Sequence, residues 1–81
     1  MTWRIAHVER ANTSPGRDTT EAALVHVKRG SQTRQITVEL AAAAVTSGQS
    51  LDARKAVRAF LDDDEPPLHL IVGSDGVFPA G

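Results

Sequence analysis

The three histidines, His7, His26 and His69, are the residues of this chain best suited to chemistry. Each falls in a different predicted strand, and neutral imidazoles on neighbouring strands can converge on one metal ion. Three protein ligands with an open fourth position are typical of catalytic zinc. The spacing of these histidines matches no local metal-binding motif, however. We therefore expect ordinary surface or interface histidines, with neither a metal site nor a cofactor.

Other kinds of catalysis have little support. The chain has no cysteine, so thiolate chemistry and disulfides are excluded. The acidic stretch 62–65 lacks the alternating ligands and central glycine of an EF-hand loop, and we interpret it as a solvated loop. No Gly-x-Ser-x-Gly motif occurs. Every serine falls in a predicted turn or helix cap: Ser14, Ser31, Ser47, Ser50 and Ser74. The sequence therefore predicts a protein that is not an enzyme.

Basic residues offer an alternative function, nucleic-acid binding. Arg29 and Arg34 lie near a predicted hairpin tip, while Arg54, Lys55 and Arg58 lie on a predicted helix. Such side chains can contact phosphates. The nine Lys and Arg residues are balanced by ten Asp and Glu residues, which gives a net charge of −1. That balance argues against a dedicated polybasic binder, so we keep nucleic acid as the less favoured partner.

The elements that must position these side chains begin with a strand over residues 3–10 and a loop over 11–20. A hairpin follows, with strands over 21–28 and 33–40 around Gly30-Ser31, because glycine readily takes the positive φ of a two-residue turn. If these two residues are central, opposed residues have numbers that sum to 61. Val25 then faces Ile36 and Ala23 faces Val38, so apolar residues meet each other and the register agrees with the pleat.

The second half of the chain contains one predicted helix. Residues 40–45 fit either an extension of the strand or a short helix, since Glu, Leu and Ala are strong helix formers. Ser50 is the predicted N-cap of a helix that runs to about Leu61, and Pro66-Pro67 prevents continuation. A strand over 68–72, a turn over 73–76 and a short tail follow. We expect one α+β domain over residues 1–81: an antiparallel sheet of about four strands with one helix packed on one face, in the order β-β-β-α-β.

The helix covers one face of this sheet, which carries Ala23, Val25, Val27, Ile36, Val38, Leu40, Leu68, Leu70 and Val72. Alternation assigns Leu24, His26, Thr37, His69 and Ile71 to the other face, which Trp3, Ile5 and His7 join if the first strand keeps its phase. An apolar patch rimmed by polar groups usually marks an interface. We predict an interface at Trp3, Ile5, Leu24 and Ile71. The alternatives are an ordinary, slightly apolar surface or a face covered by the 11–20 loop and the tail.

Residues 47–57 and the exit through Asp64-Glu65-Pro66-Pro67 loosely resemble the HicB-type bacterial antitoxins, in having a turn, a helix and an acidic-proline exit. The resemblance covers about a quarter of the chain, and Ala41–Ala44 replace the usual glycine-rich segment. It implies a domain that dimerises and pairs with a toxin.

The arginine-rich, alanine-rich composition is typical of a high-GC bacterial genome, and we see neither a signal peptide nor a membrane span. We therefore expect a cytoplasmic, non-enzymatic interaction module of unknown biological role. It forms a homodimer through its sheet and has no membrane partner; a further protein partner is also compatible with this surface. The alternative is a small nucleic-acid-binding or antitoxin-like regulatory domain.

Overall fold

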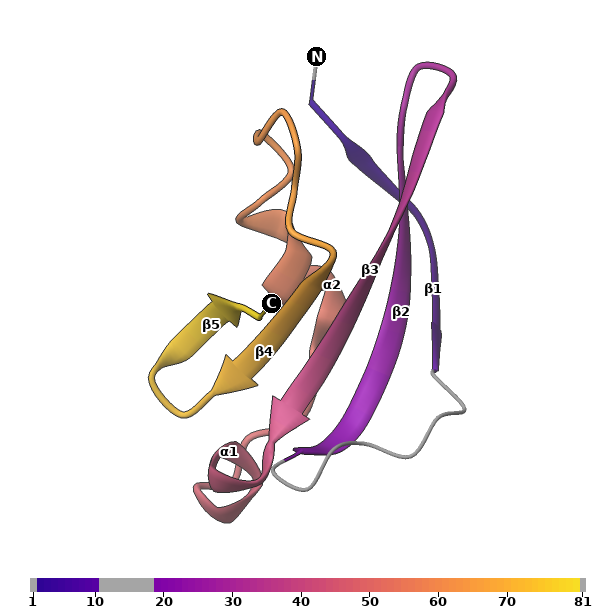
Figure 1. Ribbon diagram of the computed structural model, residues 1–81. Helices are drawn as coiled ribbons and strands as arrows, with labels where there is room; N and C mark the ends of the chain where they lie inside the picture. Colours follow the sequence, from indigo (N-terminus) through magenta and orange to yellow (C-terminus); the bar gives the residue numbers. More distant parts are fainter. Residues whose placement is uncertain (1, 11–18, 81) are drawn as a thin grey trace.

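The computed structural model describes residues 2–10 and 19–80, in which five strands form one mixed sheet in the order β1-β2-β3-β4-β5, with two short helices (Figure 1). The protein thus has a small α+β fold, as predicted. None of the helices described is long and apolar enough to span a membrane. The elements are β1 (Arg4–Arg10), β2 (Thr19–Arg29), β3 (Gln32–Ala41), α1 (Ala42–Thr46), α2 (Ala53–Arg58), β4 (His69–Gly73) and β5 (Gly76–Pro79).

The β2–β3 hairpin has the predicted register. Val25 faces Ile36, Ala23 faces Val38, and the pairing continues to Arg29 and Gln32 beside the turn. Gly30 has a φ of 61°, in the left-handed region that glycine adopts without a steric penalty. The loop predicted over 11–20 lies largely outside the described residues, and its last two residues belong to β2.

The sheet differs in two details from the predicted antiparallel sheet of about four strands. First, β3 and β4 pair in parallel, with Thr37 opposite His69 and Leu40 opposite Val72. A chain that crosses one face of the sheet through a helix returns to the same end, so its next strand runs in the same direction. Second, the predicted tail forms β5, which pairs antiparallel with β4 around the turn at Ser74 and Asp75.

The helices are shorter than expected. The ambiguous segment 40–45 is split, since β3 continues to Ala41 and α1 begins at Ala42. The helix predicted from Ser50 to Leu61 has only six residues, Ala53–Arg58, and its N-cap is Asp52. The carboxylate of Asp52 accepts a hydrogen bond from the Lys55 amide at 3.1 Å, which satisfies a donor that the first turn leaves free.

The core lies between the sheet and α2. Ala53, Ala56 and Val57 of α2 are buried against one face of β1–β4, and the partly exposed Phe60 and Leu61 pack beside them. The fully buried sheet residues are those that alternation assigned to this face: Val25, Val27, Ile36, Val38 and Leu70, with Leu40 only 1% exposed. Leu68 is the exception. It precedes β4 and is 59% exposed, because the strand begins one residue later than predicted.

The first strand does not keep one phase, which corrects the predicted face of Trp3 and Ile5. A bulge lies between Ile5 and His7, so that Ile5 pairs with Val27 but His7 pairs with His26. A bulge inserts one extra residue and reverses the alternation beyond it. Trp3 is therefore only 5% exposed in the core, and Ile5 packs against the same cluster.

Candidate interaction surface

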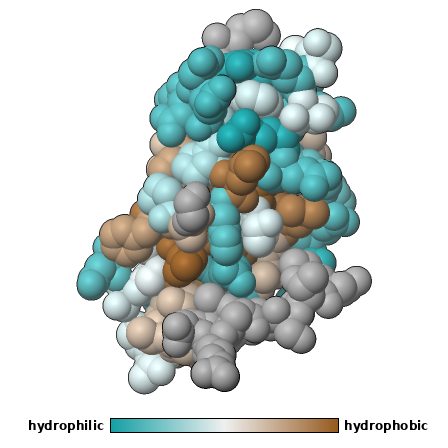
Figure 2. Space-filling model, in the orientation of Figure 1, coloured by the Kyte–Doolittle hydropathy of each residue, from teal (hydrophilic) through white to brown (hydrophobic). Residues whose placement is uncertain are grey.

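The face of the sheet opposite α2 is the candidate functional surface, and we call it the open face. In Figure 1 the strands lie in front of α2, so the viewer looks at this face. Figure 2 shows hydrophobic side chains set among hydrophilic ones on the same side. The strand registers place on it Leu24, Thr37 and His69 in one row, His7, His26 and Gln35 in a second, and Glu39, Ile71 and Phe78 in a third.

Three apolar side chains, Leu24, Ile71 and Phe78, give this face its hydrophobic content. Phe78 is 53% exposed, and it lies directly opposite Ile71 across β4 and β5. Leu24 and Ile71, two of the four residues predicted for an interface, lie on this face and are half-buried. Trp3 and Ile5 belong to the core instead, so the predicted set of interface residues is divided between the two faces.

Histidine–glutamate pairs lie beside and between these apolar residues. His69 Nε2 lies 2.5 Å from Glu39 Oε2, and His26 Nε2 lies 3.1 Å from Glu9 Oε1. The imidazole of His7 is 3.9 Å from the second oxygen of Glu9. The first two pairs join neighbouring strands, whereas His7 and Glu9 both lie on β1. Each of the two shorter pairs can exist as a hydrogen bond or, with a protonated imidazole, as an ion pair.

The three histidines do not share one site. The rings of His7 and His26 are neighbours, with centroids 5.6 Å apart. His69 lies on β4, where it is bound to Glu39 of β3. Strand β3 therefore separates it from His7 on β1 and His26 on β2. Within residues 2–10 and 19–80, no three His, Asp or Glu side chains are grouped in a way that could hold a metal ion.

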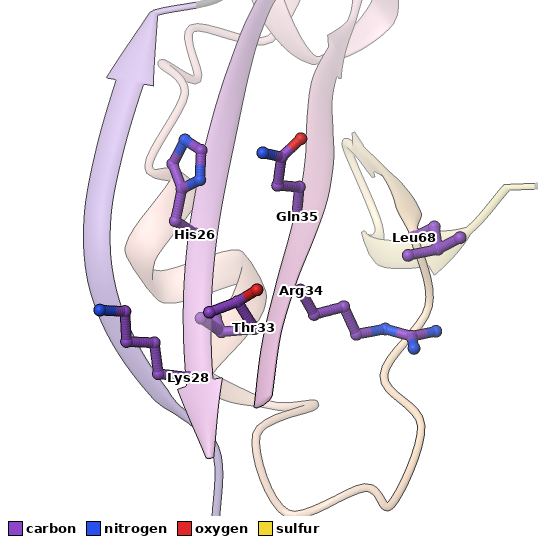
Figure 3. A pocket seen from close by; sticks show the side chains of 7 residues that line it. His26, Lys28, Thr33, Arg34, Gln35 and Leu68 are labelled. Carbon is purple, nitrogen blue, oxygen red and sulfur yellow. The ribbon is translucent and has the colours of Figure 1, made fainter. Parts of the chain in front are cut away.

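A hollow of about 690 Å³ lies at the hairpin end of this region. Its lining includes Thr33 and Gln35 of β3, His26 and Lys28 of β2, and Leu68 before β4 (Figure 3). Arg34 also reaches it, and its Nε donates to the Pro66 carbonyl at 2.8 Å. In Figure 3, Lys28 and Arg34 point to opposite sides of the hollow, so they do not converge on a common point.

The five basic residues predicted for nucleic-acid binding have different surroundings. Arg29 donates to the Asp64 carboxylate at 3.0 Å, and Arg34 is bound to Pro66 as described above. Both guanidinium groups therefore hold the 62–66 segment against the hairpin. The other three, Arg54, Lys55 and Arg58, are exposed on α2. The hairpin arginines thus have a structural role that competes with phosphate contacts.

No family model, curated protein or solved structure matches this chain. The surface itself is accordingly the basis for any functional argument.

Sequence reasoning missed several members of the open face, among them Glu9, Glu39 and Phe78. Glu39 continues the alternation of Thr37 and was detectable by counting. The turn residues Gly73-Ser-Asp-Gly76 followed by Val77-Phe78 are typical of a hairpin, which would have brought Phe78 beside Ile71. Glu9 follows His7 at the next alternate position of β1 and was also detectable by counting.

Proposed function

We propose that this protein is a non-enzymatic interaction module that forms a homodimer through the open face. The observation that carries the proposal is a set of three apolar side chains, Leu24 and the adjacent pair Ile71 and Phe78, on the sheet face opposite α2. The face of a sheet in a small α+β protein that is exposed to water is normally polar. Apolar side chains rimmed by polar groups favour an interface instead.

The charges of this face favour a second copy as the occupant. In a two-fold dimer the same patch is present on both partners, so it must be complementary to itself. Glu9 and Glu39 supply acceptors, while Arg4 and Lys28, which are opposite each other on β1 and β2, supply donors. A patch that carries both signs meets the requirement, since a rotated copy can place each group near an opposite charge.

The composition of the face is also typical of an interface. Leu24 on β2 and the adjacent Ile71 and Phe78 on β4 and β5 supply apolar area, and charged side chains lie between and around them. Interfaces of non-obligate complexes contain such a mixture of apolar and polar groups.

Sedimentation velocity at concentrations from about 5 to 200 μM tests the proposal, a range chosen to bracket a micromolar Kd. We expect a dimer for the wild type and a monomer for Leu24→Glu and for Phe78→Ser, because both changes remove apolar area from the patch. Val45→Glu is the matched control, since Val45 is 43% exposed on α1, outside the open face. It should leave the dimer intact, and circular dichroism should show that all variants are folded.

Two results would reject this function. A wild type that remains monomeric throughout the range would remove self-association. A dimer that survives both open-face substitutions but is lost in Val45→Glu would place the interface elsewhere.

A further inference from the structure

The charge of the open face is set by its histidines. The register and the alternation place four permanently charged groups there: Arg4 and Glu9 on β1, Lys28 on β2 and Glu39 on β3. Strands β4 and β5 contribute one titratable side chain to this face, that of His69. With neutral imidazoles, two positive and two negative charges cancel in the described part of the face. With His7, His26 and His69 protonated, the same face carries a net charge of +3.

Protonation of this kind is tolerated within one chain. Histidine is the side chain that ordinarily changes its charge between pH 5 and pH 8. His26 and His69 have carboxylate oxygens of Glu9 and Glu39 within hydrogen-bonding distance, so each new positive charge has a negative neighbour. His7 is 64% exposed, and water solvates its charge. His7 and His26, whose ring centroids are 5.6 Å apart, share the single carboxylate of Glu9, whereas His69 is paired with Glu39.

The same protons act differently between two copies. A two-fold axis through the open face turns the same face of each copy toward the other, so a net charge of +3 then faces an equal charge. The glutamates are already engaged with histidines of their own chain, so they compensate the repulsion only in part. Binding also removes water from these groups, which disfavours their charged forms. The dimer consequently binds fewer protons than two monomers do.

We propose that acidification dissociates the dimer, so that His7, His26 and His69 make the open face a pH-sensitive interface. This inference rests on the proposed function. The sign follows from linkage: protons favour the state that binds more of them, which is the separated monomer. The dimer is stable where the imidazoles are neutral, near pH 8, and its Kd rises as the pH falls toward 5.5.

The test is the dimer Kd from sedimentation velocity at pH 8.0, 6.5 and 5.5 at a constant, low ionic strength. We expect the Kd to increase by about tenfold or more between pH 8.0 and 5.5, equivalent to ~1.4 kcal/mol or more. The variant with His7→Gln, His26→Gln and His69→Gln should dimerise equally at all three values. Single His26→Gln and His69→Gln variants, each with a reduced pH effect, serve if the triple variant does not fold.

The outcomes separate the two proposals. A wild type with the same Kd at pH 8.0 and 5.5 would overturn the pH-sensitive interface and leave the dimer standing. A wild type that is monomeric at every pH would reject the dimer and this inference together. A triple variant that still dissociates in acid would show that other groups are responsible, which also overturns the inference.

Discussion

The guanidinium carbon of Arg29 lies 4.6 Å from the centroid of the Trp3 ring, over its face. The same guanidinium donates to the carboxylate and the main-chain carbonyl of Asp64 at 3.0 and 3.3 Å. The indole Nε1 of Trp3 donates to that carbonyl at 3.3 Å. The start of β1, the end of β2 and the acidic segment are thus joined at one end of the sheet.

Replacement of Arg29 by alanine should lower the free energy of unfolding by about 1–2 kcal/mol, because it removes a cation–π contact and hydrogen bonds made by a charged group. The ion pair itself adds little, since the Asp64 side chain is 93% exposed. Urea denaturation measures the loss. Arg54→Ala is the control, because Arg54 is exposed on α2, and its effect should stay within about 0.5 kcal/mol. Equal effects would contradict the role of Arg29.

Val57→Ala tests whether α2 is needed to complete the core. Val57 is fully buried against the sheet, so its truncation removes apolar contact and leaves a cavity. We expect a loss of about 1.5–3 kcal/mol in the free energy of unfolding. Arg58→Ala, at the next position on the exposed side, should change stability by less than about 0.5 kcal/mol. A neutral Val57→Ala would mean that the sheet is stable without its helix.

Gly30 should be sensitive to backbone conformation rather than to space. No atom lies within 4 Å of the position that a Cβ would occupy, but φ is 61°. Gly30→Ala should therefore destabilise the protein by about 1 kcal/mol, while Gly30→Asn should cost less because asparagine tolerates the left-handed region. Thermal denaturation compares the two variants. An alanine variant as stable as the asparagine variant would contradict the assigned turn.

Nucleic-acid binding is the alternative function, and the exposed basic side chains of α2 are the residues that would support it. We expect no binding of a duplex DNA or an RNA hairpin by fluorescence anisotropy at about 150 mM salt, at protein concentrations up to about 10 μM. Measurable binding that weakens steeply with salt, and that is abolished in the Arg54→Ala, Lys55→Ala, Arg58→Ala triple variant, would favour the alternative.

The sequence was most informative where contacts are local. The β2–β3 register follows from a two-residue turn and from alternation, so pairs such as Val25 and Ile36 could be predicted residue by residue. The inward position of Leu70 on β4 was predicted from alternation for the same reason. These patterns depend on near neighbours along the chain, and burial of one face enforces them.

The prediction was wrong where distant segments decide the structure. The phase of Trp3 depends on a bulge, which β1 adopts only when paired with β2. The direction of β4 depends on the route of the chain between Ala42 and Leu68, which no local pattern specifies. Half of the predicted interface, Leu24 and Ile71, lies on the open face because those residues belong to strands with regular alternation. Trp3 and Ile5 were misplaced because theirs is interrupted.

The parallel pairing of β3 with β4 has a consequence for how the native state opens. The connection between these strands contains both helices, and β4 and β5 join the sheet only through β3. Release of β4 from β3 therefore frees β4 and β5 together, while α2 stays packed on β1–β3 and the 62–66 segment stays bonded to Arg29 and Arg34. Native-state hydrogen exchange should show this as two groups of amides: a slowly exchanging set in β2 and β3, and a set in β4 and β5 that exchanges sooner and at one common opening free energy.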